Sequence, residues 1–364
     1  MERYLVLEDG TVLPGEAFGA AVESYGEVVF TTGMMGYQEA ITDQSFANQI
    51  LVFTNPLIGN YGVNFDDNES LAPQCQGVIC QEVAQVPSNW RMSTTLPEFL
   101  SQHQIPGLAG IDTRALTRKL REHGTLRGAL IDDATQIDAV MQKLQTTNLT
   151  ANSVAQVSTK TAYPNPGTGR NVVVIDYGAK HSILRELARR HCNTIVLPWT
   201  ATATEVMQLH PDGVLLSNGP GDPAEMHAAV ATVQALQTQV PVFGICLGHQ
   251  ILAQANGAKT FKLKFGHRGF NHPVRELATN RVMMTSQNHG YAVDRQSIDP
   301  QKLAVTYEEI NDQTVEGIRS QQYPAFSVQF HPDAAPGPLD AVTIFDDFMA
   351  LMDRFKEEQH AKTN

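Results

Sequence analysis

The second half of the chain alternates short apolar runs with amphipathic stretches, and this pattern predicts its fold. The apolar runs are predicted strands at Asn171–Asp176, Thr194–Leu197, Gly213–Ser217 and Val242–Ile245. Each is followed by a stretch with helical periodicity, at Ser182–Arg190, Ala203–Leu209, Ala224–Leu236 and Leu247–Ala255. Nearly continuous apolar strands that alternate with such helices are typical of a parallel sheet with helices on both faces. We therefore expect an α/β domain with a mostly parallel, doubly covered sheet.

The first 150 residues have a less regular pattern, which predicts a domain of mixed character. Alternation over Tyr4–Glu8, the turn signal Asp9-Gly10 and the extended stretch Thr11–Leu13 predict a β-hairpin. Further strands are predicted at Glu27–Thr32 and Gln49–Thr54, and helices at Thr113–His123 and Ala134–Leu144. Asp112 and Gly124 flank the first of these helices, as an N-cap and a C-terminal glycine do.

A polar segment separates the two halves. From Thr146 to Arg170 the sequence is rich in Ser, Thr, Asn, Pro and Gly, a composition typical of a linker between domains. The sequence therefore predicts an N-terminal domain at 1–150, a linker at 151–170 and a second domain at 171–364.

Cys246 lies between a predicted strand and a predicted helix, with Gly244 and Gly248 on either side. This Gly-x-Cys-x-Gly pattern is the thiol counterpart of the nucleophile elbow, a sharp turn that exposes the reactive atom above a sheet. A helix that begins just after the sulfur presents free N–H groups and a positive dipole end, which stabilise negative charge there. The alternative interpretation is a buried structural cysteine, which is the commoner kind.

A candidate base for this thiol lies near the end of the chain. Ala325–Phe330 has the pattern of a strand and leads directly into His331-Pro332-Asp333. Residues two apart in extended chain project to the same side, so Asp333 can orient the imidazole of His331. The motif alone also suits a helix cap. Combined with the Cys246 elbow, it predicts a triad of cysteine, histidine and acid.

Two polar loops are predicted near the same edge of the sheet. Ser217–Pro223 follows a strand and opens a helix, so its two glycines can expose backbone N–H groups, although a structural turn has the same pattern. Ser286–Tyr291 follows the apolar Val282–Thr285, and its polar groups can bind an amide or remain in solvent as an ordinary turn.

Composition narrows the classes of protein. The 364 residues are 42% hydrophobic and 18% charged, as in ordinary globular proteins, and the net charge of −12 argues against nucleic acid or an anionic membrane as a partner. No apolar run approaches the roughly 20 residues of a membrane span. The four cysteines lack metal-ligand spacing, and so few cysteines favour a reducing, cytoplasmic location.

Together, the Cys246 elbow, Ser217–Pro223 and His331-Pro332-Asp333 resemble the class I (triad) glutamine amidotransferases over roughly residues 171–356. Within them, the chain is similar to the small, glutamine-hydrolysing subunits of carbamoyl-phosphate synthetases. This narrower resemblance lies in the stretches Leu5–Gly10, Gly36–Ala40, Asp112–Arg118 and Lys264–Gly269. The first three belong to the N-terminal domain, which other amidotransferases of this class lack.

The resemblance implies a role for each matching position. Cys246 attacks the side-chain amide of glutamine to give a γ-glutamyl thioester and ammonia, while His331 activates the thiol and protonates the leaving amine. Backbone N–H groups of Gly219 and Leu247 form the oxyanion hole. The residues implied in binding L-glutamine are Ser45, Gly219, Gly221, Leu247, Gln250, Asn288, Gly290 and Tyr291.

The same resemblance implies a partner. Ammonia passes to a carbamoyl-phosphate synthetase large subunit, in a heterodimer or a higher assembly, which makes carbamoyl phosphate for arginine or pyrimidine synthesis from bicarbonate and ATP. ATP and Mg²⁺ are used by that subunit, so we expect no cofactor and no metal in this chain.

One residue departs from the family pattern, because the acid after His-Pro is usually glutamate and here it is Asp333. The missing methylene draws the carboxylate back by roughly 1.5 Å. We therefore expect a long contact to His331 and weakened rather than absent activity.

Two other functions are compatible with these residues. A free-standing hydrolase of γ-glutamyl amides would not need the large N-terminal domain, which carries no evident catalytic residues. A non-catalytic regulatory subunit would not need Cys246, its flanking glycines and His331.

Overall fold

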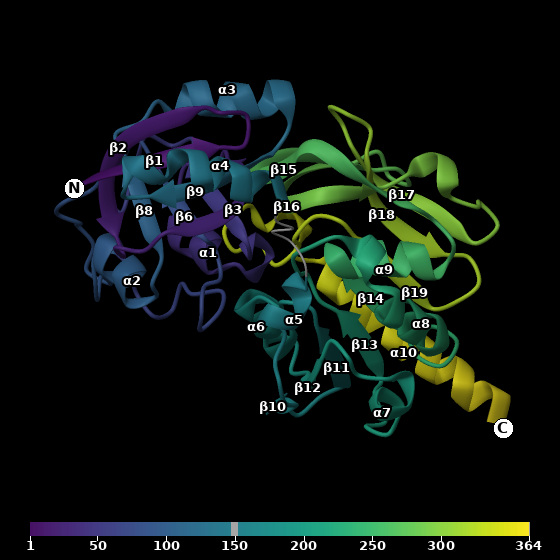
Figure 1. Ribbon diagram of the computed structural model, residues 1–364. Helices are drawn as coiled ribbons and strands as arrows, with labels where there is room; N and C mark the ends of the chain where they lie inside the picture. The colour runs from purple at the N-terminus through teal and green to yellow at the C-terminus, as the bar shows by residue number, and fades with distance from the viewer. Residues whose placement is uncertain (147–151, 364) are drawn as a thin grey trace. The chain divides into compact units, whose positions relative to one another are not determined.

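The computed structural model describes residues 1–146 and 152–363, which fall into two compact units (Figure 1). The first unit is Met1–Ser153 and the second is Val154–Asn364. Residues 147–150 of the predicted N-terminal domain and residue 151 of the predicted linker lie outside the described residues. Each unit is described by itself below.

The first unit is built on a closed β-barrel with the strand order β1-β2-β8-β6-β4-β3-β9. These strands are β1 (Glu2–Leu7), β2 (Val12–Gly19), β3 (Ser24–Thr31), β4 (Gln49–Phe53), β6 (Gly77–Ile79), β8 (Pro106–Ala109) and β9 (Leu126–Ile131). The pairing of β1 with β2 is antiparallel, which confirms the predicted hairpin. A separate pair is formed by β5 (Leu57–Ile58) and β7 (Glu82–Val83).

A partly buried ion pair joins the two strands that close this barrel. Arg3 of β1 contacts Asp132, directly after β9, at 2.6 Å, and its guanidinium also donates to the carbonyls of Phe18, Gly107 and Ala20. The helices of the unit are α1 (Tyr37–Thr42), α2 (Leu96–Gln102), α3 (Thr113–His123) and α4 (Ile137–Thr146). Helix α3 has the predicted bounds, with the Asp112 side chain accepting from the Ala115 N–H.

The segment expected as a linker contains regular structure in its described part. Helix α5 covers Ser153–Val157, and strand β10 covers Tyr163–Asn165. Strand β10 pairs antiparallel with β12 (Asn193–Pro198), so this segment contributes an edge strand to the sheet of the second unit.

The sheet of the second unit has ten strands among the described residues, in the order β10-β12-β11-β13-β14-β19-β18-β16-β15-β17. Those not yet given are β11 (Asn171–Asp176), β13 (Gly213–Leu216), β14 (Val242–Ile245), β15 (Thr260–Glu276), β16 (Val282–Val293), β17 (Leu303–Glu309), β18 (Val315–Ser320) and β19 (Ala325–Val328). The central strands β12, β11, β13, β14 and β19 are parallel. The other five run antiparallel to their neighbours, so the sheet is mixed. The apolar-run pattern identified only the parallel part, because β15 and β16 carry many polar side chains.

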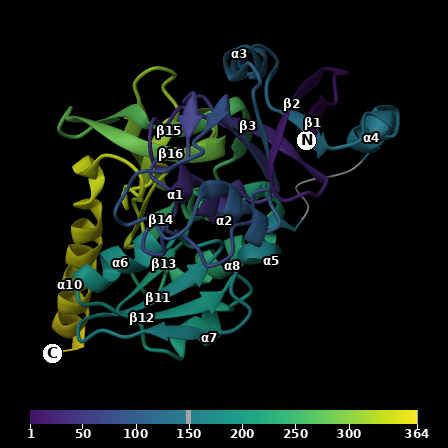
Figure 2. The ribbon, with the colours of Figure 1, turned by 90° about the vertical axis from the view of Figure 1, so that its left-hand side faces the viewer.

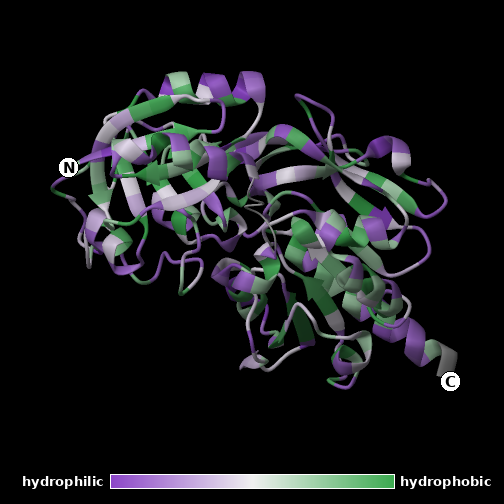
Figure 3. Ribbon diagram, in the orientation of Figure 1, coloured by the Kyte–Doolittle hydropathy of each residue, from purple (hydrophilic) through white to green (hydrophobic). Residues whose placement is uncertain are grey.

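Two apolar clusters lie on alternate sides of strand β11. Val172 and Val174 pack with α6 (His181–Arg189) and α10 (Ile344–Thr363). Val173 and Ile175 pack with α5, α7 (Ala203–Met207), α8 (His227–Leu236) and α9 (Leu247–Ala255). Figure 2 shows α10 to one side of β11 and β12, and Figure 3 shows β13 and β14 largely in the green of hydrophobic residues. Among the described residues, no helix is both long and apolar enough to cross a membrane.

Candidate active site

Cys246 lies on the turn between β14 and α9, as its sequence pattern predicts. Its backbone has φ 54° and ψ −104°, a conformation that costs a residue with a side chain about 1 to 3 kcal/mol. The Cys246 N–H donates to the carbonyl of Val328 in β19 at 2.9 Å. Since such strain is retained mainly where surroundings hold it in place, this turn is the first feature of a candidate site.

The glycines beside Cys246 allow the strand and the helix to approach closely. A Cβ on Gly244 would lie 2.6 Å from the carbonyl oxygen of Gly248, and one on Gly248 would lie 2.3 Å from that of Leu216. The Gly248 N–H donates to the Ser217 carbonyl at 3.1 Å. Only glycine leaves room for these contacts, which fix the start of α9 against the end of β13.

The other three cysteines lie in environments that disfavour reaction. Burial raises the pKa of Cys75 and that of Cys80 to about 12, and it also raises the pKa of Cys192. None of the four cysteines forms a disulfide. A buried thiol with a raised pKa is a poor nucleophile at neutral pH.

His331 is placed at the same edge of the sheet as Cys246. It follows β19, which pairs parallel with β14, so both residues lie beyond the carboxyl ends of neighbouring strands. The His331 N–H donates to the Ser286 carbonyl at 2.8 Å. Burial of the ring lowers the pKa of His331, but hydrogen bonding and charge from Asp333 and Cys246 outweigh it and raise the pKa to about 10.

Asp333 contacts both His331 and a lysine that the sequence analysis did not identify. Its Oδ1 lies 3.4 Å from His331 Nδ1, longer than an ordinary hydrogen bond. Its Oδ2 accepts from Lys180 Nζ at 2.6 Å and from Ser182 Oγ at 2.7 Å. Burial raises the pKa of Asp333, but the charges of Lys180 and His331 outweigh it and hold the pKa well below its usual range.

Lys180 and Ser182 are the site residues that sequence reasoning missed. Lys180 is buried, and its Nζ also donates to the Ala335 carbonyl at 2.6 Å. It follows strand β11 by four residues, at the carboxyl edge where Cys246 and His331 were also expected. A lysine after a buried parallel strand was the available signal, since ligands bind at this edge of such sheets.

The loop after β13 lies against the start of α9. A Cβ on Gly219 would be 3.0 Å from Leu247 Cδ2 and 2.3 Å from the Tyr177 carbonyl oxygen. Gly221 has φ 93°, so this turn requires the left-handed region that glycine adopts readily. Gly219 therefore lies against Leu247. The roles of Gly219, Gly221 and Leu247 in binding glutamine stay predictions from the family resemblance.

The expected polar loop at Ser286–Tyr291 was wrong, because this stretch lies within strand β16. It pairs with β15 through His267 opposite His289, Arg268 opposite Asn288 and Gly269 opposite Gln287. Polar residues are tolerated in this buried strand because they bond to one another, and composition alone could not show that.

Four predicted glutamine-binding residues lie in or against β16. Cys246 Sγ donates to the Asn288 carbonyl at 3.6 Å, which places this strand beside the thiol. Gln250 Nε2 donates to the Tyr291 carbonyl at 2.8 Å and to Gln329 Oε1 at 2.9 Å. Gly290 lies between Asn288 and Tyr291 in the same strand. The structure thus brings Gln250, Asn288, Gly290 and Tyr291 to the region of Cys246.

Comparison with known proteins identifies two family domains. The family described as "Carbamoyl-phosphate synthase small chain, CPSase domain" matches residues 5–130, and "Glutamine amidotransferase class-I" matches residues 173–351. A carbamoyl phosphate synthase small chain of Streptococcus pneumoniae serotype 4 is 58% identical over 356 residues, which cover 98% of this chain and 99% of that protein. One of Streptococcus mutans is 55% identical over 361 residues, 99% of both chains. The chain belongs to the carbamoyl phosphate synthase small-chain family.

In this carbamoyl phosphate synthase small chain, Cys246, His331 and Asp333 all fall in the class I amidotransferase domain. Ser45, by contrast, belongs to the first unit, on the short 3₁₀ turn Gln44–Phe46, where its N–H donates to Asp43 Oδ1 at 2.9 Å. Its part in binding glutamine stays a prediction from the family resemblance.

Proposed function

We propose that this chain is the glutamine-hydrolysing subunit of a carbamoyl-phosphate synthetase, and that Cys246 is its nucleophile. The observation that carries the proposal is the conformation of Cys246, a non-glycine residue with φ 54° between β14 and α9. A nucleophile needs a base within reach. His331 follows the strand next to β14, and its raised pKa includes a contribution from the Cys246 sulfur.

The reaction proceeds in two steps. In the first, Cys246 Sγ bonds to the side-chain carbonyl carbon of glutamine, the C–N bond breaks, and His331 gives the departing nitrogen its proton, so that ammonia leaves. In the second, water attacks the γ-glutamyl thioester, which releases glutamate and restores the thiol. In each step His331 acts first as base, taking the proton of the thiol or of the water, and then as acid, giving that proton to the departing nitrogen or sulfur.

Negative charge on the carbonyl oxygen needs donors in both steps. The N–H of Leu247, at the first position of α9, and that of Gly219, which lies against Leu247, are the candidates. Neither Leu247 nor Gly219 belongs to a strand, so their N–H groups are not used in the hydrogen bonding of the sheet. The N-terminus of a helix, where Leu247 lies, also stabilises an anion. Gly221, Gln250, Asn288, Gly290 and Tyr291, together with Ser45, are proposed to bind the rest of L-glutamine.

Ammonia is of use to the cell only if it reaches an acceptor. The relatives that match this chain along almost its full length are small chains, so we propose a large subunit as the partner. That subunit would use ATP with Mg²⁺ and bicarbonate to form carbamoyl phosphate, and this chain would hold none of these.

The test is a Cys246→Ser variant assembled with the large subunit. We expect glutamine-dependent carbamoyl phosphate synthesis to fall at least about a thousandfold, because the attacking thiolate is lost. Synthesis from ammonium salts should persist. The matched control is Cys192→Ser, a buried thiol of the same unit. Retained glutamine hydrolysis in Cys246→Ser, or equal loss in the control, would contradict the assignment.

A further inference from the structure

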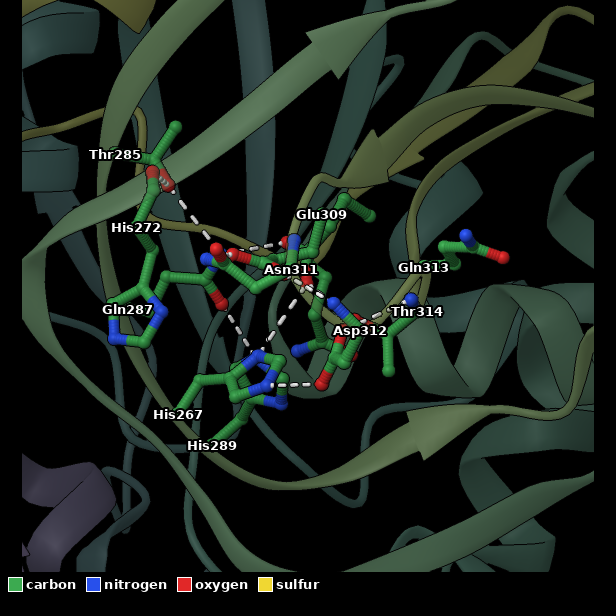
Figure 4. Close-up of polar contacts among 12 residues, drawn as sticks. His267, His272, Thr285, Gln287, His289, Glu309, Asn311, Asp312, Gln313 and Thr314 are labelled. Atoms are coloured by element: carbon green, nitrogen blue, oxygen red, sulfur yellow. Dashed lines mark hydrogen bonds and ion pairs between the residues drawn. The ribbon is translucent and has the colours of Figure 1, made fainter.

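Three potential metal ligands converge in the second unit, in a cluster that the proposed reaction does not use. His267 comes from β15, His289 from β16 and Glu316 from β18, and all three side chains are buried. One ligand atom from each lies within 4.8 Å of the other two. Figure 4 shows His267 and His289 side by side with their surrounding polar groups.

Within this cluster, both histidines approach Glu316 without forming a hydrogen bond to it. His267 Nδ1 and His289 Nε2 each lie 3.8 Å from the same atom, Glu316 Oε1. That separation is too long for a hydrogen bond. Among the described residues, His267 Nδ1 is a buried nitrogen with no hydrogen-bond partner. Two nitrogens thus face one carboxylate oxygen without bonding to it.

In each of the three side chains, the polar atom that points away from the cluster already has a hydrogen-bond partner. His267 Nε2 contacts Asp312 Oδ2 at 2.8 Å, and His289 Nδ1 contacts the Tyr291 carbonyl at 2.7 Å. Glu316 Oε2 accepts from Gln287 Nε2 at 2.9 Å. Metal-binding histidines characteristically donate their second nitrogen to a carboxylate or a backbone carbonyl, which fixes the ring and leaves the other nitrogen for the metal. Both histidines here have that arrangement.

The hydrogen-bond pattern around His289 is also short of one proton or one cation. Because its Nδ1 faces a carbonyl, that nitrogen carries the proton, and Nε2 of the neutral ring is a lone pair. Nε2 lies 2.5 Å from Gln287 Oε1, which is also an acceptor. Turning the Gln287 amide would instead set its oxygen against Glu316 Oε2. In either orientation two acceptors face each other unless a proton or a cation is added.

We propose that His267 Nδ1, His289 Nε2 and Glu316 Oε1 bind one divalent cation of the zinc type. Two imidazoles and one carboxylate are ligands for borderline transition cations, whereas Mg²⁺ and Ca²⁺ prefer all-oxygen sites. Ligands about 2.0–2.2 Å from tetrahedral zinc lie roughly 3.4 Å apart. Each histidine nitrogen, at 3.8 Å, would move only slightly closer to Glu316 Oε1, and the two nitrogens already lie within 4.8 Å of each other. Gln287 Oε1 or a water molecule would take the fourth position.

Such an ion would link three strands directly beside the thiol. His289 follows Asn288, whose carbonyl accepts from Cys246 Sγ. The ion would therefore fix the part of β16 that lies against the nucleophile. It would stabilise the second unit without taking part in the reaction, since its ligands do not include Cys246 or His331.

The test is a metal titration of the full chain in a Cys246→Ser background, because Cys246 with His331 is the obvious competing zinc site. Protein freed of metal with a chelator would be titrated with Zn²⁺ by calorimetry, and with Co²⁺ by visible absorption. We expect one equivalent of each ion, with the strong visible bands of tetrahedral cobalt. Glu316→Gln and His267→Asn should weaken binding at least about a hundredfold.

The control variant is His272→Asn, whose ring lies 5.1 Å from that of His267 but is not among the three ligands. It should bind as tightly as the parent. Absence of stoichiometric uptake by the parent, or unchanged uptake in Glu316→Gln, would overturn the proposal and leave the cluster as a proton-sharing network. If one of these variants does not fold, X-ray absorption at the zinc edge of the Cys246→Ser parent identifies the metal ligands instead. Two imidazoles with no sulfur support the site, and a sulfur ligand or no bound zinc refutes it.

Discussion

Asp333 contacts His331 through one carboxylate oxygen and Lys180 through the other, and the contact to Lys180 is the shorter one. The shorter side chain leaves Oδ1 3.4 Å from the His331 ring, whereas Oδ2 lies 2.6 Å from Lys180 Nζ. A buried carboxylate with two cationic neighbours stays charged, as its lowered pKa indicates. Lys180 and Ser182 therefore set the position from which Asp333 acts on His331.

We predict that Lys180→Met destabilises the second unit by about 3 kcal/mol, because it leaves the Asp333 charge buried without its closest partner. It should also lower kcat for glutamine hydrolysis more than it changes KM. The double variant Lys180→Met/Asp333→Asn should be more stable than Lys180→Met, since both charges are then removed. Urea unfolding in a Trp90→Phe background measures this, because Trp199 then reports on the second unit alone. Equal stability of the single and double variants would contradict the pairing.

At the scale of elements, the site depends on a contact between the backbones of three of them. Strand β14, helix α9 and the end of β13 meet at Gly244 and Gly248, where any Cβ would overlap a carbonyl group. The strained φ of Cys246 persists because this contact leaves the turn no other path.

Gly248→Ala should therefore separate α9 from β13 and move Cys246. We expect a loss of about 2–3 kcal/mol from overpacking, together with a fall in kcat of about a hundredfold, as a displacement near 1 Å produces. Gly257→Ala is the matched control, because Gly257 has φ 92° but no heavy atom within 4 Å of an added Cβ. That variant should lose only about 1 kcal/mol from backbone strain and keep its turnover. Comparable activity in both variants would show that the close contact is unimportant.

At the scale of the whole molecule, the two units have separate cores and separate sheets. The barrel of the first unit is closed by the pairing of β1 with β9, while the mixed sheet of the second carries the cysteine, the histidine and the acid. A hydrolase alone would need only the second unit, so we propose that the first links activity to a partner.

We predict that the isolated chain hydrolyses glutamine slowly, and that the large subunit with ATP and bicarbonate raises turnover strongly. Small displacements of catalytic groups change rates about a hundredfold per ångström, so a partner can regulate the site without adding a residue to it. Assays of glutamate release with and without the large subunit and its substrates measure the effect. Full activity of the chain alone would instead favour a free-standing hydrolase.

The local sequence was sufficient to predict the bounds of elements that bury an apolar run or end in a distinctive capping residue. Strands β11 and β14 and helices α3 and α9 have the predicted bounds, because burial on both faces, Asp112 and the glycines around Cys246 act over a few residues. The same local rules suggested Cys246 and His331, since both follow strands of one parallel sheet.

Only the tertiary structure decided which distant polar groups meet. The closed barrel depends on pairing between strands far apart in sequence, such as β1 with β9, and strand β16 is stabilised by partners that composition does not show. Lys180 reaches Asp333 across 153 positions, and Glu316 comes to His267 and His289 from another strand. A buried charge is stable only beside a partner, and that partner is fixed by the fold rather than by spacing along the chain.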